Sequence, residues 1–254
     1  NVRKDYTTKT LGTVTAVNNF NLTIKKGECF SFLGPSGCGK TTTLRMLAGF
    51  EDLSEGEIRL EGKVVSNKAK NLYVPPEHRN LGMVFQAFAV WPHLNVFDNV
   101  AFPLQVQKRP KAEIEERVNL ALKQTNLLDQ AKVFPSDLSG GEQQRIALAR
   151  SIVVNPGILL LDEPLSNLDP KLRESMRFEI KRLQKEYNFT IVFVTHDQSE
   201  ALALSDRLLV MNKGEIIQIG TPQELYNKPV SLFVHNFLGE SNFTKVEYRD
   251  GKVY

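Results

Sequence analysis

A chain of 254 residues with 41% hydrophobic content is long enough to bury a sizeable core, and this length suits one large α/β domain with a smaller lobe. The 32 Lys and Arg residues against 29 Asp and Glu residues leave a net charge of only +3, and no basic block indicates nucleic acid as a partner. No apolar run approaches the roughly 18 to 20 residues of a membrane span, so we expect any membrane role to come through another chain.

The first third of the sequence predicts a strand, a loop and a helix in immediate succession. Up to about residue 33 we expect short strands with turns, one of them at 22–24 and another in the apolar run 29–33. Residues 41–48 continue in helix-forming types. Cys29 in the strand and Cys38 in the loop are the only cysteines, which indicates a reducing cytoplasm and no disulfide framework.

Residues 34–41 between that strand and helix read Gly-Pro-Ser-Gly-Cys-Gly-Lys-Thr, the phosphate-loop pattern G-x-x-x-x-G-K-T. Glycines let backbone N–H groups close around phosphates, Lys40 supplies a positive charge, and the Thr41 hydroxyl can ligate Mg²⁺. The glycine order G-x-x-G-x-G argues against a dinucleotide fingerprint. The predicted phosphate-contacting set is Gly34, Pro35, Ser36, Gly37, Cys38, Gly39, Lys40, Thr41 and Thr42.

The middle of the chain changes from strand to helix patterns. Residues 58–60 and 63–65 flank Glu61-Gly62 and predict a short hairpin. The apolar stretch 82–85 ends at Gln86, and the segment 111–124 then carries Ile114, Val118 and Leu122 at helical spacing. We therefore expect helices after residue 87, up to a helical run at 146–154.

A second acidic element follows the buried strand expected at 158–161. Asp162 and Glu163 stand at its C-terminal end, where parallel sheets bind ligands. Asp162 is predicted to hold Mg²⁺, usually through water, and Glu163 to orient and deprotonate an attacking water. The simpler alternative is an acidic turn closed by Pro164.

Three helix starts are expected in the last third. Asp169 before Pro170 reads as an N-cap of a helix at 170–187, whose apolar face would hold Leu172, Met176, Ile180, Leu183 and Tyr187. His196 ends a strand at 191–195, and Asp197 with Glu200 reads as a capping box, as does Thr221 with Glu224. The four histidines show no close ligand spacing, so no transition-metal site is expected.

Residues 138–145, Leu-Ser-Gly-Gly-Glu-Gln-Gln-Arg, distinguish this chain from other phosphate-loop proteins. Together with the elements above they resemble the ATPase subunit of ATP-binding cassette (ABC) transporters, whose signature is L-S-G-G-Q/E, over about residues 10 to 240. The resemblance implies an α/β fold: a P-loop NTPase core with a mostly parallel sheet, an antiparallel β subdomain and an inserted helical lobe. It implies a core at 1–86 and 156–236, a lobe at 87–155, and the start of a truncated β-rich domain at 237–254, opening with a hairpin of 243–248 and 252–254.

The same resemblance implies roles that the residues alone do not. Gln86 would sense the γ-phosphate, join the Mg²⁺ site and connect to the membrane subunit, and His196 would contact the γ-phosphate as a switch. Asp169 lies in the loop 166–169 that would cross a dimer interface. Ser139, Gly140 and Gly141 would close over the γ-phosphate of a second cassette packed head to tail.

The implied cofactors are ATP and Mg²⁺, and the implied partners are an identical or paired cassette, integral membrane permease subunits and, indirectly, a periplasmic or extracellular solute-binding protein. Residues 74–79 and 220–225 resemble bacterial importer ATPases for sugars, polyamines, ferric iron, phosphonates or inorganic anions. We therefore expect an importer motor, peripheral on the cytoplasmic face of the membrane. A soluble cassette ATPase of DNA repair or translation is the alternative, and the single cassette without sustained heptads disfavours it.

Two details stay open at this point. Phe88, Trp91 and Phe97 follow Gln86 and are either contacts for a membrane subunit or the core of the helical lobe. Leu11 stands where relatives place an aromatic residue on the adenine, which predicts only a modest preference for ATP over GTP. Tyr6 is the nearest aromatic residue in sequence that could substitute for it.

Overall fold

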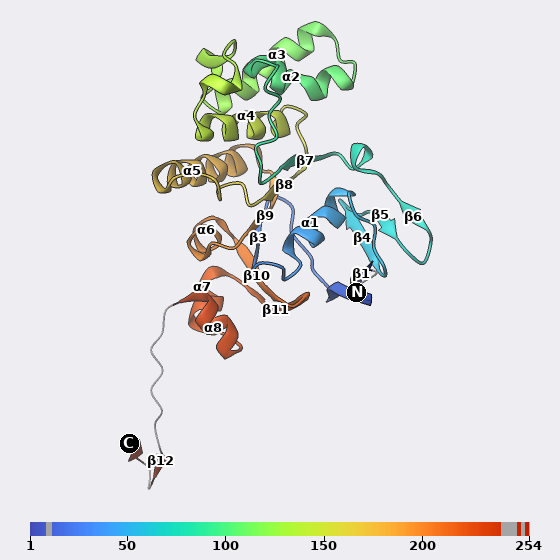
Figure 1. The fold of residues 1–254 in the computed structure, drawn as a ribbon, viewed down its shortest axis with the longest axis vertical. Helices are drawn as coiled ribbons and strands as arrows, with labels where there is room; N and C mark the ends of the chain where they lie inside the picture. The colour runs from blue at the N-terminus through green and yellow to red at the C-terminus, as the bar shows by residue number, and fades with distance from the viewer. Residues whose placement is uncertain (9–11, 240–247, 250–251, 254) are drawn as a thin grey trace.

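A computed structural model describes residues 1–8, 12–239, 248–249 and 252–253 (Figure 1). Its centre is a six-stranded sheet in the order β11-β10-β3-β9-β8-β7, in which only β11 runs antiparallel to its neighbour. The apolar runs of the sequence supply the central strands because these strands are buried on both faces. The strands are β3 (Cys29–Leu33), β7 (Leu81–Val84), β8 (Ile158–Asp162), β9 (Thr190–Thr195), β10 (Arg207–Asn212) and β11 (Glu215–Gly220). The expected mostly parallel sheet is confirmed.

Helices cover both faces of this sheet. Figure 1 shows α1 (Lys40–Ala48) on one side and α5 (Pro170–Tyr187) and α6 (Gln198–Leu204) on the other. Met176, Ile180 and Leu183 of α5 are buried, as its apolar periodicity predicts. Two short helices, α7 (Pro222–Asn227) and α8 (Leu232–Leu238), follow β11, and α7 begins with the predicted capping box of Thr221 and Glu224.

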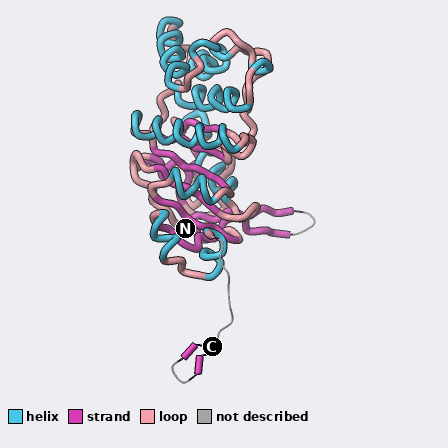
Figure 2. Tube along the Cα trace, turned by 90° about the vertical axis from the view of Figure 1, so that its left-hand side faces the viewer, coloured by secondary structure: helices cyan, strands magenta, loops and turns pink. Residues whose placement is uncertain are grey.

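An antiparallel region packs beside α1. It contains the pair β1 (Val2–Thr8) and β2 (Gly12–Phe20), which projects from the body in Figure 2, and the sheet of β4 (Glu57–Leu60), β5 (Lys63–Asn67) and β6 (Leu72–Tyr73). The predicted hairpin is confirmed, and Glu61 and Gly62 both take the positive φ that a tight β-hairpin turn requires. The strand expected at 22–24 is wrong, because β2 ends at Phe20 and the Thr23 carbonyl accepts from the Arg207 side chain.

Arg79 ties α1 to this antiparallel region. The residue follows a 3₁₀ turn at Pro76–His78, and its buried guanidinium donates to the carbonyl oxygens of Met46 at 2.8 Å and Leu47 at 2.9 Å. The same group donates to Ser66 Oγ at 2.8 Å. A cation at the C-terminal end of a helix satisfies carbonyls that have no partner within the helix. The arginine of the segment 74–79 therefore fixes the end of α1 opposite the phosphate loop.

The segment after β7 forms a helical lobe, seen at the top of Figure 1. It holds α2 (Val96–Val106), α3 (Lys111–Gln124) and α4 (Gly140–Ile152), with 3₁₀ turns at Leu128–Gln130 and Pro135–Asp137. Val118 and Leu122 are fully buried and Ile114 packs against the same cluster, so the predicted helix at 111–124 is confirmed. The run expected at 146–154 ends two residues earlier, at Ile152.

Near the end of the chain, β12 (Tyr248–Arg249) pairs antiparallel with β13 (Lys252–Val253), which matches part of the expected hairpin. The rest of that hairpin lies outside the described residues. None of the helices in the described ranges combines the length and the hydropathy needed to cross a bilayer.

Candidate active site

A cavity of about 440 Å³ opens where the parallel strands end. Residues far apart in the sequence meet in its walls: the phosphate loop, Gln86 after β7, Glu163 after β8 and His196 after β9. Strands of a parallel sheet present their carboxyl ends at one edge, and this edge is where α/β folds bind ligands. The lining residues are Ala16, Ser36, Gly37, Gly39, Lys40, Thr41, Thr42, Gln86, Glu163 and His196.

The phosphate loop is shaped by its glycines. Gly39 has φ 108°, and a Cβ at this position would lie 2.5 Å from the carbonyl oxygen of Ala16. A Cβ on Gly34 would lie 2.5 Å from the carbonyl oxygen of Met211, so neither position tolerates a side chain. The loop leads directly into α1, whose first backbone N–H groups lack partners within the helix. This arrangement favours an anion at the start of α1.

Lys40 is 4% exposed, and its ammonium group stays within the loop. Nζ donates to the carbonyl oxygen of Gly34 at 2.7 Å and to that of Pro35 at 3.1 Å. Cys38 Sγ lies 4.0 Å from the same nitrogen, and burial raises the pKa of the Cys38 thiol. The loop therefore presents a positive charge beside the cavity and keeps its cysteine protonated.

Thr41 and Asp162 form a pair of oxygen ligands. The Thr41 hydroxyl donates to Asp162 Oδ1 at 3.1 Å, and this carboxyl group is buried at the end of β8. Burial raises the pKa of Asp162, while the Thr41 hydrogen bond and the nearby Arg45 and Lys40 oppose that rise. A bound divalent cation would compensate the cost of keeping this carboxylate charged.

These donors fit Mg²⁺. A hydroxyl, a carboxylate and the amide of Gln86 are the hard oxygen ligands that Mg²⁺ prefers, and this ion usually takes few protein ligands beside phosphate oxygens and water. No group of three or more His, Cys, Asp and Glu side chains suited to a metal occurs in the described ranges. The chemistry of the site thus suits a cation that arrives with phosphates.

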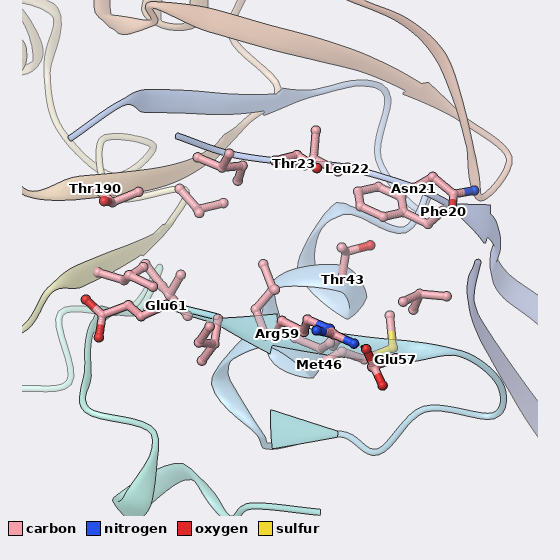
Figure 3. Close-up of a pocket in the computed structure, with 18 of the residues that line it drawn as sticks. Phe20, Asn21, Leu22, Thr23, Thr43, Met46, Glu57, Arg59, Glu61 and Thr190 are labelled. Carbon is pink, nitrogen blue, oxygen red and sulfur yellow. The ribbon is translucent and has the colours of Figure 1, made fainter. Parts of the chain in front are cut away.

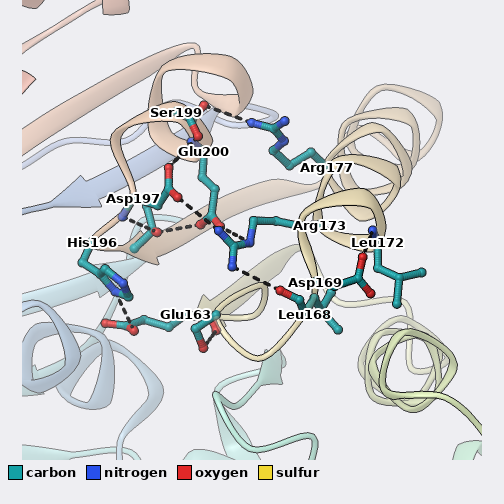
Figure 4. Close-up of polar contacts among 12 residues, drawn as sticks. Glu163, Leu168, Asp169, Leu172, Arg173, Arg177, His196, Asp197, Ser199 and Glu200 are labelled. Carbon is teal, nitrogen blue, oxygen red and sulfur yellow. Dashed lines mark hydrogen bonds and ion pairs between the residues drawn. The ribbon is translucent and has the colours of Figure 1, made fainter. Parts of the chain in front are cut away.

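Glu163 and His196 face one another across a gap between strand ends (Figure 4). His196 Nδ1 lies 3.0 Å from Glu163 Oε2. Glu163 has φ 45°, an unusual conformation for a residue with a side chain, and its own N–H donates to the carbonyl of Val194 at 2.9 Å. The left-handed backbone turns the chain sharply after β8 and is held by this hydrogen bond to β9.

Arg173 connects the two loops beside this pair, and sequence reasoning missed it. Its guanidinium reaches the carbonyl oxygen of Leu168 at 3.1 Å, Asp197 Oδ2 at 3.4 Å and Glu200 Oε1 at 3.6 Å (Figure 4). An arginine in the first turn of a helix opposes the helix dipole, and that mismatch was the signal for an acidic partner outside α5. The residue joins the loop before α5 to the loop after β9.

The capping box expected at Asp197 is only half correct. The Asp197 side chain accepts from the Glu200 N–H at 3.1 Å, so the cap itself is confirmed. Glu200 is 2% exposed and accepts from the Thr195 hydroxyl at 2.6 Å instead of turning back to the cap. Burial raises the pKa of Glu200, which favours its protonation. The Glu200 carboxyl group contacts Thr195 and Arg173 inside the protein and therefore does not complete the predicted capping box.

Ser139, Gly140 and Gly141 are not brought to this cavity, and neither is Asp169. Ser139 begins α4 in the helical lobe, where its hydroxyl and the Glu142 side chain form a capping box. The Ser-x-x-Glu spacing carried that signal, which sequence reasoning overlooked. Asp169 caps α5 as expected and accepts from the N–H groups of Lys171 and Leu172.

Two residues were considered for the adenine contact, Leu11 and Tyr6. Leu11, the predicted adenine contact, lies outside the described residues. Tyr6 lies on β1 with the Lys4 ammonium 4.9 Å from its ring and does not line the cavity.

The three aromatic residues that directly follow Gln86, Phe88, Trp91 and Phe97, are half-buried. Phe88 and Phe97 pack against the apolar cluster of the lobe. The Trp91 ring lies 4.3 Å from the Phe102 ring, and the Arg150 guanidinium lies 4.4 Å above it. Arg150 of α4 also donates to the Phe88 carbonyl at 3.4 Å, so this segment is attached to the signature helix.

Comparisons with known proteins agree with this geometry. A family model described as "ABC transporter" matches residues 17–166. The spermidine/putrescine import ATP-binding protein PotA of Thermobifida fusca is 55% identical over 230 residues, 91% of this chain and 58% of that relative. The trehalose/maltose import ATP-binding protein MalK of Thermococcus litoralis is 49% identical over 231 residues, 91% of this chain and 62% of that relative. The chain thus spans about three fifths of the length of these curated relatives.

Solved structures share the fold. A dimeric ATP-binding cassette in a post-hydrolysis state with ADP and Pi is 33% identical, with a TM-score of 0.75 over 87% of this chain and 97% of that one. The cbiO1 protein of Clostridium perfringens, part of the ABC transporter complex cbiONQ, is 31% identical, with a TM-score of 0.78 over 88% of both chains.

Proposed function

The chain belongs to the ABC transporter family, and from this membership we propose that it is the ATP-hydrolysing motor subunit of an importer. The observation that carries the proposal is the meeting of Glu163, His196, Lys40 and the Thr41 hydroxyl around one cavity. Two carboxylates of one dipeptide then have separate environments. Asp162 faces Thr41 at the start of α1, and Glu163 faces His196.

We assign the reaction steps to these residues as follows. The backbone N–H groups of the loop and the Lys40 ammonium bind the phosphates of ATP. The Glu163 carboxylate accepts a proton from the attacking water while the water oxygen bonds to the γ-phosphorus. The bond from that phosphorus to the β,γ-bridging oxygen breaks, which gives ADP and phosphate. His196 holds Glu163 in position and contacts the γ-phosphate. Mg²⁺, bound through Thr41, Asp162 and Gln86, would neutralise phosphate charge.

A second cassette completes the site in this proposal. Ser139, Gly140, Gly141 and Asp169 lie outside the cavity of their own chain, yet Ser139 is exposed at the start of a capped helix, whose N–H groups suit a phosphate. ATP would then lie between the loop of one chain and the signature of the other. The dimeric cassette with ADP and Pi supports this arrangement by similarity.

The proposal for membrane subunits and solute rests on the relatives of this chain. Relatives named for spermidine/putrescine and for trehalose/maltose import match this chain at 55% and 49% identity, so similarity of this subunit does not select one solute. We propose that it sits peripherally at the cytoplasmic face, contacts permease subunits through the helical lobe, and serves a solute-binding protein indirectly. Nucleic acid is not a partner in this proposal.

Co-expression with candidate membrane subunits tests the function. We expect the chain to copurify with its permease partners and its ATPase rate to rise when transported solute and solute-binding protein are added to the reconstituted complex. Stimulation by single- or double-stranded DNA or by RNA, with no copurifying membrane subunit, would instead support the soluble cassette alternative.

A further inference from the structure

A second cavity of about 540 Å³ lies between the antiparallel region, α1 and the central sheet. Figure 3 shows its walls coming from the segment after β2, from α1, from β4 and from the sheet strands. The volume falls within the range of sites that bind small molecules. The nucleotide cavity has separate walls, because the two sets of lining residues share no member.

The floor of this second cavity is apolar. Phe32, Met46, Leu160 and Val192 form it, and all four are buried in one hydrophobic cluster. Side chains of this kind gain nothing from water, and apolar cavities of comparable character accept apolar ligands. The occupant that this floor favours is therefore hydrophobic.

Two polar side chains of the cavity wall, Thr43 and Thr190, already have a hydrogen-bond partner. The Thr43 hydroxyl donates to the carbonyl oxygen of Gly39 at 2.9 Å, and the Thr190 hydroxyl accepts from the N–H of Gly27 at 3.0 Å. Both are neutral hydroxyl groups, so neither supplies a charge that would select a charged ligand group. A charge carried into this space would lose its hydration without finding a partner.

The charged groups that line the cavity are the side chains of Glu57, Arg59 and Glu61 and the amino group of Asn1, which is exposed and donates to Asn21 Oδ1 at 2.6 Å. Figure 3 shows the Arg59 guanidinium beside the Glu57 carboxylate, and these two form an ion pair. Glu61 lies at another edge of the opening and is exposed. Arg59 is paired with Glu57, and the Asn1 amino group is exposed and donates to Asn21, so neither offers a desolvated positive charge to an anionic head group. We propose that this cavity binds one uncharged, largely apolar small molecule, with any hydroxyl or carbonyl group of the ligand at the rim.

α1 separates this cavity from the nucleotide cavity. Its first turn, Lys40 to Thr42, lines the nucleotide cavity, whereas Thr43, Met46 and Leu47 line the second one. Met46 thus reports on the second cavity from a helix that begins at the phosphate loop. The chain has four methionines, and Met176 lies in a different hydrophobic cluster from Met46. The methyl group of Met176 therefore serves as an internal control for that of Met46.

The test uses three probes of equal chain length, 1-octanol, octanoate and octylammonium, added to protein labelled with ¹³C at the methionine methyl groups. We expect saturable one-site binding of 1-octanol that shifts the Met46 resonance and leaves Met176 unchanged. Both charged probes should bind at least about tenfold more weakly, because the floor offers no partner for a charge. Equal or tighter binding of a charged probe would overturn the assignment of ligand class.

Two filling substitutions test the location. Leu22→Trp and Leu60→Phe place extra atoms in the cavity from opposite walls and should weaken 1-octanol binding by more than about tenfold. Leu120→Trp, at an exposed position on α3, is the matched control and should bind 1-octanol as the native chain does. A native-like Met46 shift in both filled variants, or no Met46 shift in the native chain, would overturn the site. ATP affinity measured in parallel shows that each variant is folded, so the result is independent of the proposed transport function.

Discussion

His196 Nδ1 lies 3.0 Å from Glu163 Oε2, although the two residues are 33 positions apart in the sequence. They meet because β8 and β9 are neighbouring parallel strands, so that the residues following them emerge at one edge of the sheet. The imidazole fixes the carboxylate that we assign as the base. The position of each group therefore depends on the other.

Glu163→Gln should keep ATP affinity and lose turnover. The amide preserves the shape of the side chain and a hydrogen bond to His196 but cannot accept a proton, so we expect kcat to fall by about 10² to 10⁴. Lys40→Ala should lose nucleotide binding as well, and Glu174→Gln, exposed on α5, is the control that should change neither quantity. Equilibrium ATP titration and phosphate release measure both effects. Native-rate hydrolysis by Glu163→Gln would show that another group is the base.

The same variant should accumulate as an ATP-bound dimer. Hydrolysis reopens the proposed head-to-tail dimer, so a chain that binds ATP without turnover should double its mass in multi-angle light scattering. Adding Ser139→Asp to Glu163→Gln retains a good helix cap but places a negative charge where the partner's γ-phosphate would lie, and should prevent the dimer. A monomer at saturating ATP in the single variant would contradict nucleotide-driven closure.

Asp162→Asn should stabilise the nucleotide-free protein at neutral pH while abolishing Mg²⁺-dependent hydrolysis. Burial raises the folded-state pKa of Asp162, so the folded chain binds its proton more tightly than the unfolded chain does. The cost of ionising this group in the fold is absent below the unfolded pKa of about 3.9 and grows as the pH rises through the raised folded pKa. The stability advantage of the variant should therefore appear above about pH 4 and increase with pH up to that raised value.

Urea unfolding of both proteins from pH 4 to pH 8 measures this advantage. Asp129 is exposed on a 3₁₀ turn of the lobe, so Asp129→Asn controls for the general effect of removing a carboxylate. If the stability advantage of Asp162→Asn is instead largest near pH 4, the charged Asp162 carboxylate stabilises the fold, and the prediction is wrong.

Arg79→Met should lower the free energy of unfolding by about 3 kcal/mol, because it leaves buried carbonyl oxygens at the end of α1 without a donor. Arg79→Lys should recover little, since one ammonium cannot reach Met46, Leu47 and Ser66 in the planar arrangement of a guanidinium. Arg109→Met removes an exposed ion pair with Glu113 in the segment before α3 and should change stability by no more than about 0.5 kcal/mol. Denaturant unfolding of the three variants decides; equal losses for Arg79→Met and Arg109→Met would exclude the anchoring role.

Trp91→Ala should cost about 2 kcal/mol of stability, less than for a fully buried tryptophan because this ring is half-buried. Trp91→Phe keeps a ring face for Arg150 and should restore most of that loss. Leu120→Ala on the exposed face of α3 is the control. Unchanged thermal unfolding of Trp91→Ala, combined with lost stimulation by membrane subunits, would identify Trp91 as a partner contact instead of a core residue.

Local patterns predicted most of the core. The glycines of 34–41, the apolar run before them and the caps at Asp169 and Thr221 each depend on neighbours within a few residues, and all were recovered. The strand expected at 22–24 failed because a short apolar alternation does not reveal whether a neighbouring strand is available.

Contacts between distant segments were beyond the sequence. Glu200 and Arg173 pair through the packing of α5 against α6, and the left-handed conformation of Glu163 is held by a hydrogen bond to Val194. The basic residue in the first turn of α5 indicates that an acidic partner exists but not which one, and the conformation of Glu163 has no local signature. The family resemblance predicted that Gln86 and His196 belong to the nucleotide site, and both residues line the cavity. Local patterns alone did not indicate this.

The position of α1 between two cavities has a thermodynamic consequence. ATP binds at the first turn of this helix, and a hydrophobic molecule would press on Met46 and Leu47 one turn later. If that molecule changes the affinity for ATP by some factor, ATP must change the affinity for the molecule by the same factor. In such a protein the fraction of chains that hold ATP would depend on the concentration of the small hydrophobic molecule.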